Sequence, residues 1–454
     1  MNMFGAQSML VWLPVTILIY TLLPQRHRYF SLLFVSIVNL SLLDFDSVIA
    51  AISVSVVTYA CANAMLRSSH HNKIVWLGIG IIITILLMLF SRDGSESLLG
   101  VQFRWIGLSY YGLMNIGFLL DINSGKSKNT PLPSTYILSS IFFPYILAGP
   151  VCNIRELTPQ FERGAFPPNS TIWIQLKRIL YGAFCKIVVA DNLGKYITST
   201  LSEQGDMSVV VLATVAIGYS VEIYFDFLGY TEIARGVAGL FGIDIPPNFN
   251  KPYLATNTRD FWKRWHMSLT NWFRQYLYIP LGGYGTIFFP LLILFIFTIS
   301  AIWHGLRLNY LIWGLMHAGS YLLFHYYHRF QQSNHTSGSA SNIVSINVRR
   351  ILFFLWLSAT WLVFRTEDLQ ILFNNVTLDG ELLPNNDYYS LFWVLVVSLI
   401  LLVIDHSGTP ERIIITRAQT NKLIAQELVF VDLLILSLFI LATGGHGDFL
   451  YFKF

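Results

Sequence analysis

Charged residues are scarce in this chain of 454 residues: only 12% are Asp, Glu, Lys or Arg, where a soluble domain carries about 25%. Hydrophobic residues make up 54%, which leaves too little polar surface for a water-soluble fold. The formal net charge of +4 is too weak and too scattered for a surface that binds nucleic acid. Disorder, a coiled coil and collagen are excluded by the same composition.

Cysteine is also rare, and the common site motifs are missing. Cys61, Cys152 and Cys185 lie in apolar stretches without a CxxC or Cys/His ligand spacing, so neither a disulfide framework nor a zinc site is expected. No HExxH pattern occurs, and no GxSxG, Walker or dinucleotide glycine pattern stands in the right setting. We therefore expect no metal and no permanently bound cofactor.

Long apolar runs recur through the whole chain instead, and each of the longest approaches the roughly 20 residues that a helix needs to cross a bilayer. The fold class that they predict is an all-α polytopic membrane protein with about eleven transmembrane helices, since one or two runs are expected to be re-entrant. No internal repeat or soluble segment divides the chain, and the polar stretch 331–347 is typical of a flexible loop, so residues 1–454 form one predicted domain. The runs cover 9–23, 29–43, 47–66, 74–90, 105–120, 135–151, 172–190, 208–225, 287–303, 310–326, 351–364, 391–404 and 428–442.

Short loops of alternating charge predict the orientation, because Lys and Arg accumulate on the cytoplasmic side of a membrane. The first run lacks the basic flank and the cleavage site of a signal peptide, so it is expected to stay. With the basic loops inside, the N-terminus is extracytoplasmic. The basic loops are 26–28, 67–73 and 126–128, and the acidic loops are 44–46 and 92–96.

Polar residues cluster between Glu222 and His317, so function is sought there. In Lys251–Pro280, aromatic residues recur at three- and four-residue spacing opposite basic ones, which predicts an amphipathic helix at the cytoplasmic headgroups. His266 falls on the aromatic face of that helix and is expected to point into protein.

Charged residues interrupt the apolar sequence just before that helix. Glu222, Asp226, Glu232 and Arg235 are costly inside a span and normally face a cavity or a partner. Glycines 229, 236, 239 and 242 favour close helix packing over contact with a ligand.

Histidine is one of the few side chains that can carry a proton near neutral pH. His304 ends an apolar run and is followed by Gly305. A lone intramembrane histidine is more often structural, but His304 and His266 together form a candidate polar centre. His317, thirteen residues further on, is interpreted as a structural neighbour.

Four stretches carry a family signature as they stand: FPYILAGPVCNIRELTPQF at 143–161, EIYFDFLGYTEIARGVAGLFGIDIPPNFNKPY at 222–253, FWKRWHMSLTNWFRQYLYIPLGG at 261–283 and IWHGLRLNYLIWGLMHA at 302–318. Their order and spacing resemble the membrane-bound O-acyltransferase family, with a signature core at about 143–320. The resemblance is to its bacterial branch, which contains membrane subunits for O-acetylation of alginate, peptidoglycan and cellulose and the D-alanyl-teichoic acid transfer protein.

The resemblance implies a ring of helices around a central tunnel, with His304 as the catalytic residue and His266 at the second signature position. It implies transfer of an acetyl or other short acyl group across the bacterial inner membrane, from acetyl-coenzyme A or another acyl thioester, for O-acetylation of an extracytoplasmic polysaccharide. The expected partners are membrane lipid, a periplasmic SGNH-type acetyltransferase and an exopolysaccharide or peptidoglycan acceptor. Gln275 replaces a more usual Asp and Arg307–Asn309 replace small and aromatic residues, which leaves the acceptor open.

A transporter or flippase of a small or lipid-linked substrate is the alternative, since it would also contain many spans and intramembrane carboxylates. The missing internal repeat and the aromatic amphipathic stretch in mid-chain argue against it.

The predicted topology can be tested with single cysteines and a membrane-impermeant thiol reagent. A cysteine in the 44–46 loop should be labelled in intact cells, because that loop is expected outside. A cysteine in the 67–73 loop should be labelled only after the cells are opened, and the reverse pattern would invert the orientation.

Overall fold

The computed structural model divides into two compact units, each containing parts of the chain that are distant in sequence. Unit 1 comprises residues 1–179 and 230–247, and unit 2 comprises residues 180–229 and 248–454. The structure describes residues 12–90, 105–202, 207–333, 343–366, 388–408 and 421–441, together with 369, 376–377, 410 and 413–414. Part of the predicted loop at 331–347 lies outside them.

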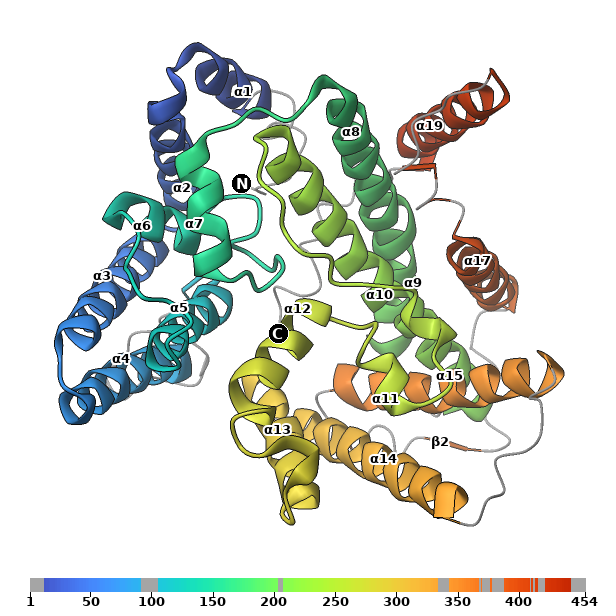
Figure 1. The fold of residues 1–454 in the computed structure, drawn as a ribbon. Coiled ribbons are helices and arrows are strands. Elements are labelled where there is room, and N and C mark those ends of the chain that lie inside the picture. The colour runs from blue at the N-terminus through green and yellow to red at the C-terminus, as the bar shows by residue number, and fades with distance from the viewer. Residues whose placement is uncertain are drawn as a thin grey trace. The chain divides into compact units, whose positions relative to one another are not determined.

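Unit 1 is built from helices joined by short connections, and α3, α4 and α5 pack side by side within it (Figure 1). Asp44 caps α3 by accepting a hydrogen bond from the Ser47 amide, and Gly164 ends α7 in a left-handed conformation. The helices are α1 (Leu13–Leu22), α2 (Arg28–Leu43), α3 (Phe45–Arg67), α4 (His70–Phe90), α5 (Leu108–Asn123), α6 (Pro133–Ile141), α7 (Ile154–Arg163) and α8 (Asn169–Ala183), whose last residues belong to unit 2.

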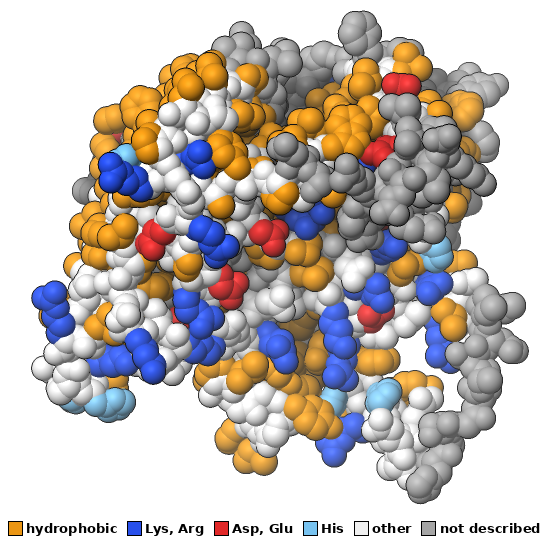
Figure 2. Space-filling model, turned by 45° about the horizontal axis from the view of Figure 1, so that its top comes forward, with side chains coloured by type: hydrophobic (Ala, Val, Ile, Leu, Met, Phe, Trp, Pro, Cys, Tyr) orange, Lys and Arg blue, Asp and Glu red, His pale blue; other side chains and the backbone are white. Residues whose placement is uncertain are grey.

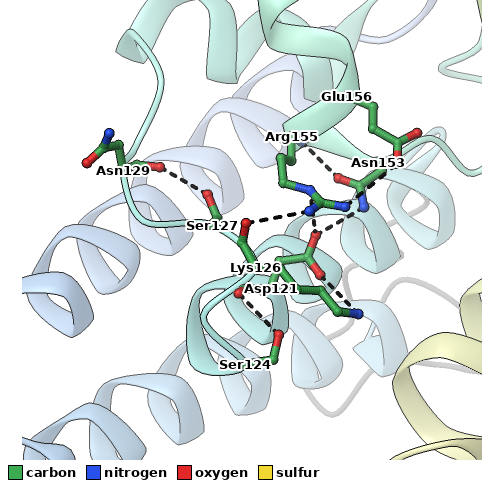
Figure 3. A network of polar contacts seen from close by, with 8 residues as sticks. All are labelled: Asp121, Ser124, Lys126, Ser127, Asn129, Asn153, Arg155 and Glu156. Carbon is green, nitrogen blue, oxygen red and sulfur yellow. Dashed lines mark hydrogen bonds and ion pairs between the residues drawn. The ribbon is translucent and has the colours of Figure 1, made fainter.

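A buried carboxylate joins the end of α5 to the start of α7. The Asn153 amide donates a hydrogen bond of 3.0 Å to Asp121 Oδ2, and Arg155 and Lys126 lie 3.5 and 3.9 Å from the same carboxylate. Figure 3 shows Asp121 surrounded by these three side chains. Because Asp121 is fully buried, this network holds the two helices by charge-assisted contacts.

The predicted span 135–151 is wrong as a continuous helix. Helix α6 ends at Ile141, and the chain continues to Asn153 in turns and extended backbone. Nine helical residues rise only about 14 Å, which is too short to cross a bilayer.

Unit 2 is also mainly helical, and α13 and α14 form a closely packed pair (Figure 1). Two-residue strands β1 (Met207–Ser208) and β2 (Val376–Thr377) pair in parallel. The other elements are the π-helix η3 (Phe184–Ala190), α9 (Asp191–Ser202), α10 (Val209–Leu240), which enters unit 1 after Gly229, η4 (Pro252–Leu254), α11 (Thr258–Phe261), α12 (Met267–Phe273), the π-helix η5 (Arg274–Tyr278), η6 (Gly283–Gly285), α13 (Phe289–His304), α14 (Leu308–Ser333), α15 (Ile343–Arg365), α17 (Tyr388–Ser407) and α19 (Asn421–Leu441).

Within the described residues, four helices are long and apolar enough to cross a membrane: α3, the His70–Met88 part of α4, α10, and the Ser345–Arg365 part of α15. Shorter apolar helices, α13 among them, add to these. Large apolar side chains are exposed on many helices, and Figure 2 shows them over wide areas of the visible face. An exposed apolar surface of this extent is suited to lipid, so the chain is integral to the membrane.

Helix α10 extends fifteen residues beyond the predicted boundary at 225, because its charges do not end it. Gly229 and Gly236 let α10 lie against other backbone, as predicted from the glycine pattern. A Cβ at Gly229 would lie 2.7 Å from the Gly182 carbonyl oxygen, and one at Gly236 would lie 2.8 Å from that of Gln175.

Two carboxylates of α10, Asp226 and Glu232, are paired with cations. Lys186 Nζ lies 2.7 Å from Asp226 Oδ1 and 2.8 Å from Asp191 Oδ1, and all three side chains are largely buried. Glu232 pairs in unit 1 with Arg178, at 2.7 Å. Asp226 and Glu232 thus face partners, as the sequence predicted, whereas Glu222 Oε2 is buried without a hydrogen-bond partner among the described residues.

Lys186→Met should destabilise the protein strongly, because two buried carboxylates lose their shared cation. Breaking a buried ion pair costs about 3–5 kcal/mol. Thermal unfolding of the detergent-purified variant measures the loss as a lower Tm. The exposed Lys263 supplies the control: Lys263→Met should keep the wild-type Tm, and equal losses in both variants would contradict the ion-pair role.

Candidate active site

His304 is the last residue of α13, and the residue after it fixes where the helix stops. Gly305 has φ +156° and ψ 161°, a backbone conformation that is almost restricted to glycine. A Cβ at this position would also come within 2.9 Å of the Tyr310 ring. The chain therefore turns sharply after His304 and holds the imidazole at the helix end.

Aromatic rings surround the His304 imidazole, which is only 8% exposed. The centroid of Trp303 lies at 4.9 Å, that of Phe364 at 5.0 Å and that of Trp313 at 5.3 Å, all with steeply inclined planes. Tyr310 follows at 6.1 Å. Helices α13, α14 and α15 each contribute to this enclosure, which we call the aromatic enclosure of His304.

His266 lies in the turn between α11 and α12, not on one continuous helix, so the predicted amphipathic helix over 251–280 is wrong. Its φ of +42° is left-handed, which is rare for a residue other than glycine. Asn248 stabilises the break, because its carbonyl oxygen accepts from the Met267 amide at 2.9 Å and its side chain accepts from Ser268 Oγ at 2.6 Å. The spacing of aromatic residues along 251–280 could not show that Asn248 binds the backbone and side chain just after His266.

The side chain of His266 does point into protein, as predicted, and is 1% exposed. Its ring meets Phe227 at 4.8 Å and Trp303 at 5.9 Å. Burial lowers the pKa of His266, which lies outside the candidate spans, to about 3, so its imidazole is neutral at physiological pH.

The two predicted site residues, His266 and His304, share one neighbour, because the Trp303 indole contacts both imidazoles. His266 and His304, 38 positions apart in sequence, share this neighbour because the turn at His266 and the end of α13 lie in the same unit. This arrangement fits one polar centre with two histidines.

His317 uses both ring nitrogens within the protein, which agrees with a structural role. Trp262 Nε1 donates to its Nδ1 at 3.3 Å, so its proton is on Nε2, which faces Thr360 Oγ1 at 3.2 Å. Thr360 in turn donates to the Leu357 carbonyl oxygen. His317 therefore ties α14 to α15 and to the turn after α11.

Tyr310, Trp313 and Phe364 are neighbours of His304 that the sequence analysis did not assign to the site, although the signature stretch 302–318 contains the first two. Their stretches read as parts of spans, where aromatic residues are common. Only the packing of α13, α14 and α15 brings them to the imidazole.

Comparison with known proteins gives several matches. The profile described as MBOAT, membrane-bound O-acyltransferase family, matches residues 26–364. The chain is 30% identical over 341 residues to a peptidoglycan O-acetyltransferase of Helicobacter pylori, covering 66% of this chain and 63% of that protein. It is 28% identical to the probable alginate O-acetylase AlgI of Pseudomonas aeruginosa, covering 80% of this chain and 71% of that protein.

A teichoic acid D-alanyltransferase of Bacillus subtilis is 29% identical over 245 residues, which cover 50% of this chain and 60% of that protein. The matched segments therefore span less than two thirds of the H. pylori and B. subtilis relatives.

If His266 and His304 act on one transition state, their substitutions should be strongly non-additive. His304→Ala and His266→Ala should each lower acyl transfer, and the double variant should lose little more, because a catalytic unit is already broken by one change. Transfer in reconstituted membranes, normalised to folded protein, measures the effect. If the two losses of transfer simply multiply, His266 does not belong to the site. The control combines His304→Ala with His328→Ala, because His328 is exposed on α14 and its change should act independently.

Proposed function

The chain belongs to the membrane-bound O-acyltransferase family, and we propose that it transfers an acetyl or similarly short acyl group from a cytoplasmic thioester to a hydroxyl outside the membrane. The observation that carries this proposal is the buried His304 at the end of α13, inside its aromatic enclosure. An imidazole in that place can exchange protons while apolar rings keep water away from a reactive thioester.

The reaction balances with His304 as the only proton carrier. His304 takes the proton of the attacking hydroxyl, the hydroxyl oxygen bonds to the acyl carbon, and the carbon–sulfur bond breaks. The imidazolium then returns the proton to the leaving thiolate, so the products are an ester and a thiol. No oxidant, metal or further proton source enters this sequence of steps.

His266 is assigned a positioning role in this proposal. A neutral imidazole held by a fixed turn can donate a hydrogen bond toward the acyl carbonyl oxygen, where negative charge develops. Its contact with Trp303 places it on the same indole as His304. The left-handed backbone at His266 is the kind of strain that persists where the surrounding structure fixes a functional side chain.

The same proposal includes the acyl donor, the acceptor and the membrane topology. Acetyl-coenzyme A or another acyl thioester is the donor, and the accepting hydroxyl belongs to an extracytoplasmic polysaccharide or to a periplasmic SGNH-type partner that passes the group on. The relatives named for peptidoglycan, alginate and teichoic acid support a cell-envelope polymer as the final acceptor. About eleven spans around a central tunnel, in a bacterial inner membrane with the N-terminus outside, would connect donor and acceptor.

His304→Ala should reduce transfer to near background while the protein still folds and inserts, because loss of a general base typically costs about 10²–10⁴-fold. Transfer of radiolabelled acetyl from acetyl-coenzyme A in membranes containing equal amounts of each protein measures this. His328→Ala changes an exposed histidine of α14 and should keep wild-type transfer.

Substantial product from folded His304→Ala protein would overturn the catalytic role. A transporter would leave the thioester bond intact in every variant, so the absence of His304-dependent thioester cleavage would favour that alternative.

A further inference from the structure

Basic side chains gather near the end of α14, where α11 packs against that helix. His325 on α14 interacts electrostatically with Arg259 of α11 and with two basic residues of its own helix. Arg259 and Arg274, the first residue of η5, both interact with Tyr278. All of these basic side chains are exposed except that of His325, which is half-buried. We call them the cationic cluster: Arg259, Arg274, His325, His328 and Arg329.

The cationic cluster lies in a part of the chain that is poor in acid. From residue 261 to residue 366 there is no Asp or Glu, so neither η5 nor α14 carries an acidic residue. Asp260, which precedes this stretch, forms an ion pair with Arg264 at 2.9 Å. Among the described residues, no arginine of the cationic cluster forms an ion pair with a carboxylate. A surface that concentrates one sign of charge attracts ions of the other sign, so this surface is suited to an anion.

Aromatic rings form a fixed base under the cationic cluster. The ring centroid of His325 lies 4.6 Å from that of the buried Phe289 and 5.3 Å from that of Tyr284. Tyr278 and Tyr321 pack against the same hydrophobic cluster as Phe289. The elements that carry the cations are therefore held relative to one another, which lowers the ordering cost of binding an anion between them.

The exposed side chains of α14 indicate the depth of the cationic cluster in the membrane. The exposed aliphatic residues of the helix end at Leu323, and exposed aromatic residues follow between Tyr326 and Phe330. Aliphatic side chains suit the hydrocarbon interior, whereas Tyr and Trp concentrate at the level of the headgroups. The cations at 325–329 share this aromatic level, which favours a lipid phosphate over a soluble anion.

We propose that the cationic cluster binds the phosphate of an anionic phospholipid headgroup. Arginine suits this ligand, because its guanidinium can donate two parallel hydrogen bonds to phosphate oxygens. One anion would join α11, η5 and α14, and the turn that carries His266 lies between the first two of these elements. A bound lipid would thus stabilise unit 2 around that turn. This binding goes beyond the proposed acyl transfer and does not depend on it.

Native mass spectrometry of the detergent-purified protein tests the proposal. Phosphatidylglycerol has one negative charge and phosphatidylcholine has no net charge, so the ratio of their dissociation constants measures the preference for an anion. The wild type should prefer phosphatidylglycerol. Arg259→Gln should reduce the preference about 5-fold and Arg259→Gln/Arg329→Gln about 30-fold, because each basic side chain near a headgroup strengthens anion binding by a similar factor.

Arg67 and Arg163 supply the matched control. Both are exposed arginines of unit 1, and Arg67→Gln/Arg163→Gln removes the same amount of charge without changing the cationic cluster. This variant should keep the wild-type preference for phosphatidylglycerol. An equal loss in the two double variants would show a general effect of charge and overturn the proposal.

Thermal unfolding gives a second readout and checks that the variants fold. Without added phospholipid, all of them should share the wild-type Tm, because the exchanged side chains are exposed. Added phosphatidylglycerol should raise the Tm of the wild type and of Arg67→Gln/Arg163→Gln, but hardly that of Arg259→Gln/Arg329→Gln. An equal rise in all three proteins would contradict a site at the cationic cluster.

Photolabelling locates the lipid and separates it from a soluble phosphate compound. A phosphatidylglycerol analogue with a diazirine on its headgroup should label peptides that contain Tyr284 or residues 321–330, and unlabelled phosphatidylglycerol should compete. Acetyl-coenzyme A at the same concentration should not compete. Displacement by acetyl-coenzyme A, or competed labelling confined to other peptides, would overturn the lipid site, whereas loss of acyl transfer alone would count only against the proposed function.

Discussion

A single packing constraint organises the functional unit: the imidazole of His304 must sit at the end of a helix and inside a shell of aromatic rings. Gly305 makes the first part possible, since its backbone conformation ends α13 where a side chain would meet Tyr310. Trp313 and Phe364 provide the second part from α14 and α15. Burial of large rings is the main stabilising contribution here, and it also excludes water from the one group suited to carry a proton.

Several buried polar groups of this apolar protein are held by specific partners. Lys186 serves two carboxylates, His317 is bonded at both nitrogens, and Asn248 holds the turn that carries His266. Each arrangement offsets the cost of burying a polar group. The charge of Asp226 is thus tolerated inside α10 through its pairing with Lys186, and the helix continues past it to Leu240.

The sequence predicted much of the fold class and the site, because apolar length and the position of histidines are local signals. The run at 287–303 closely matches α13, and the burial of His266 is as expected. The points at which predicted helices are interrupted were not predictable in the same way. The helix over 251–280 fails at His266 because Asn248, eighteen residues earlier, captures the following backbone. The aromatic neighbours of His304 depend on three helices packing together, which spacing along one segment cannot show.

The most direct measurement is a photolabelling experiment at the acyl group. A coenzyme A thioether, stable because it has no thioester bond, would carry a small diazirine at the position of the acyl methyl group. After irradiation of the purified protein, mass spectrometry should find the label on Trp303, Trp313 or Phe364, and excess acetyl-coenzyme A should abolish it. Competed labelling confined to residues away from the His304 enclosure would contradict acyl transfer at this site.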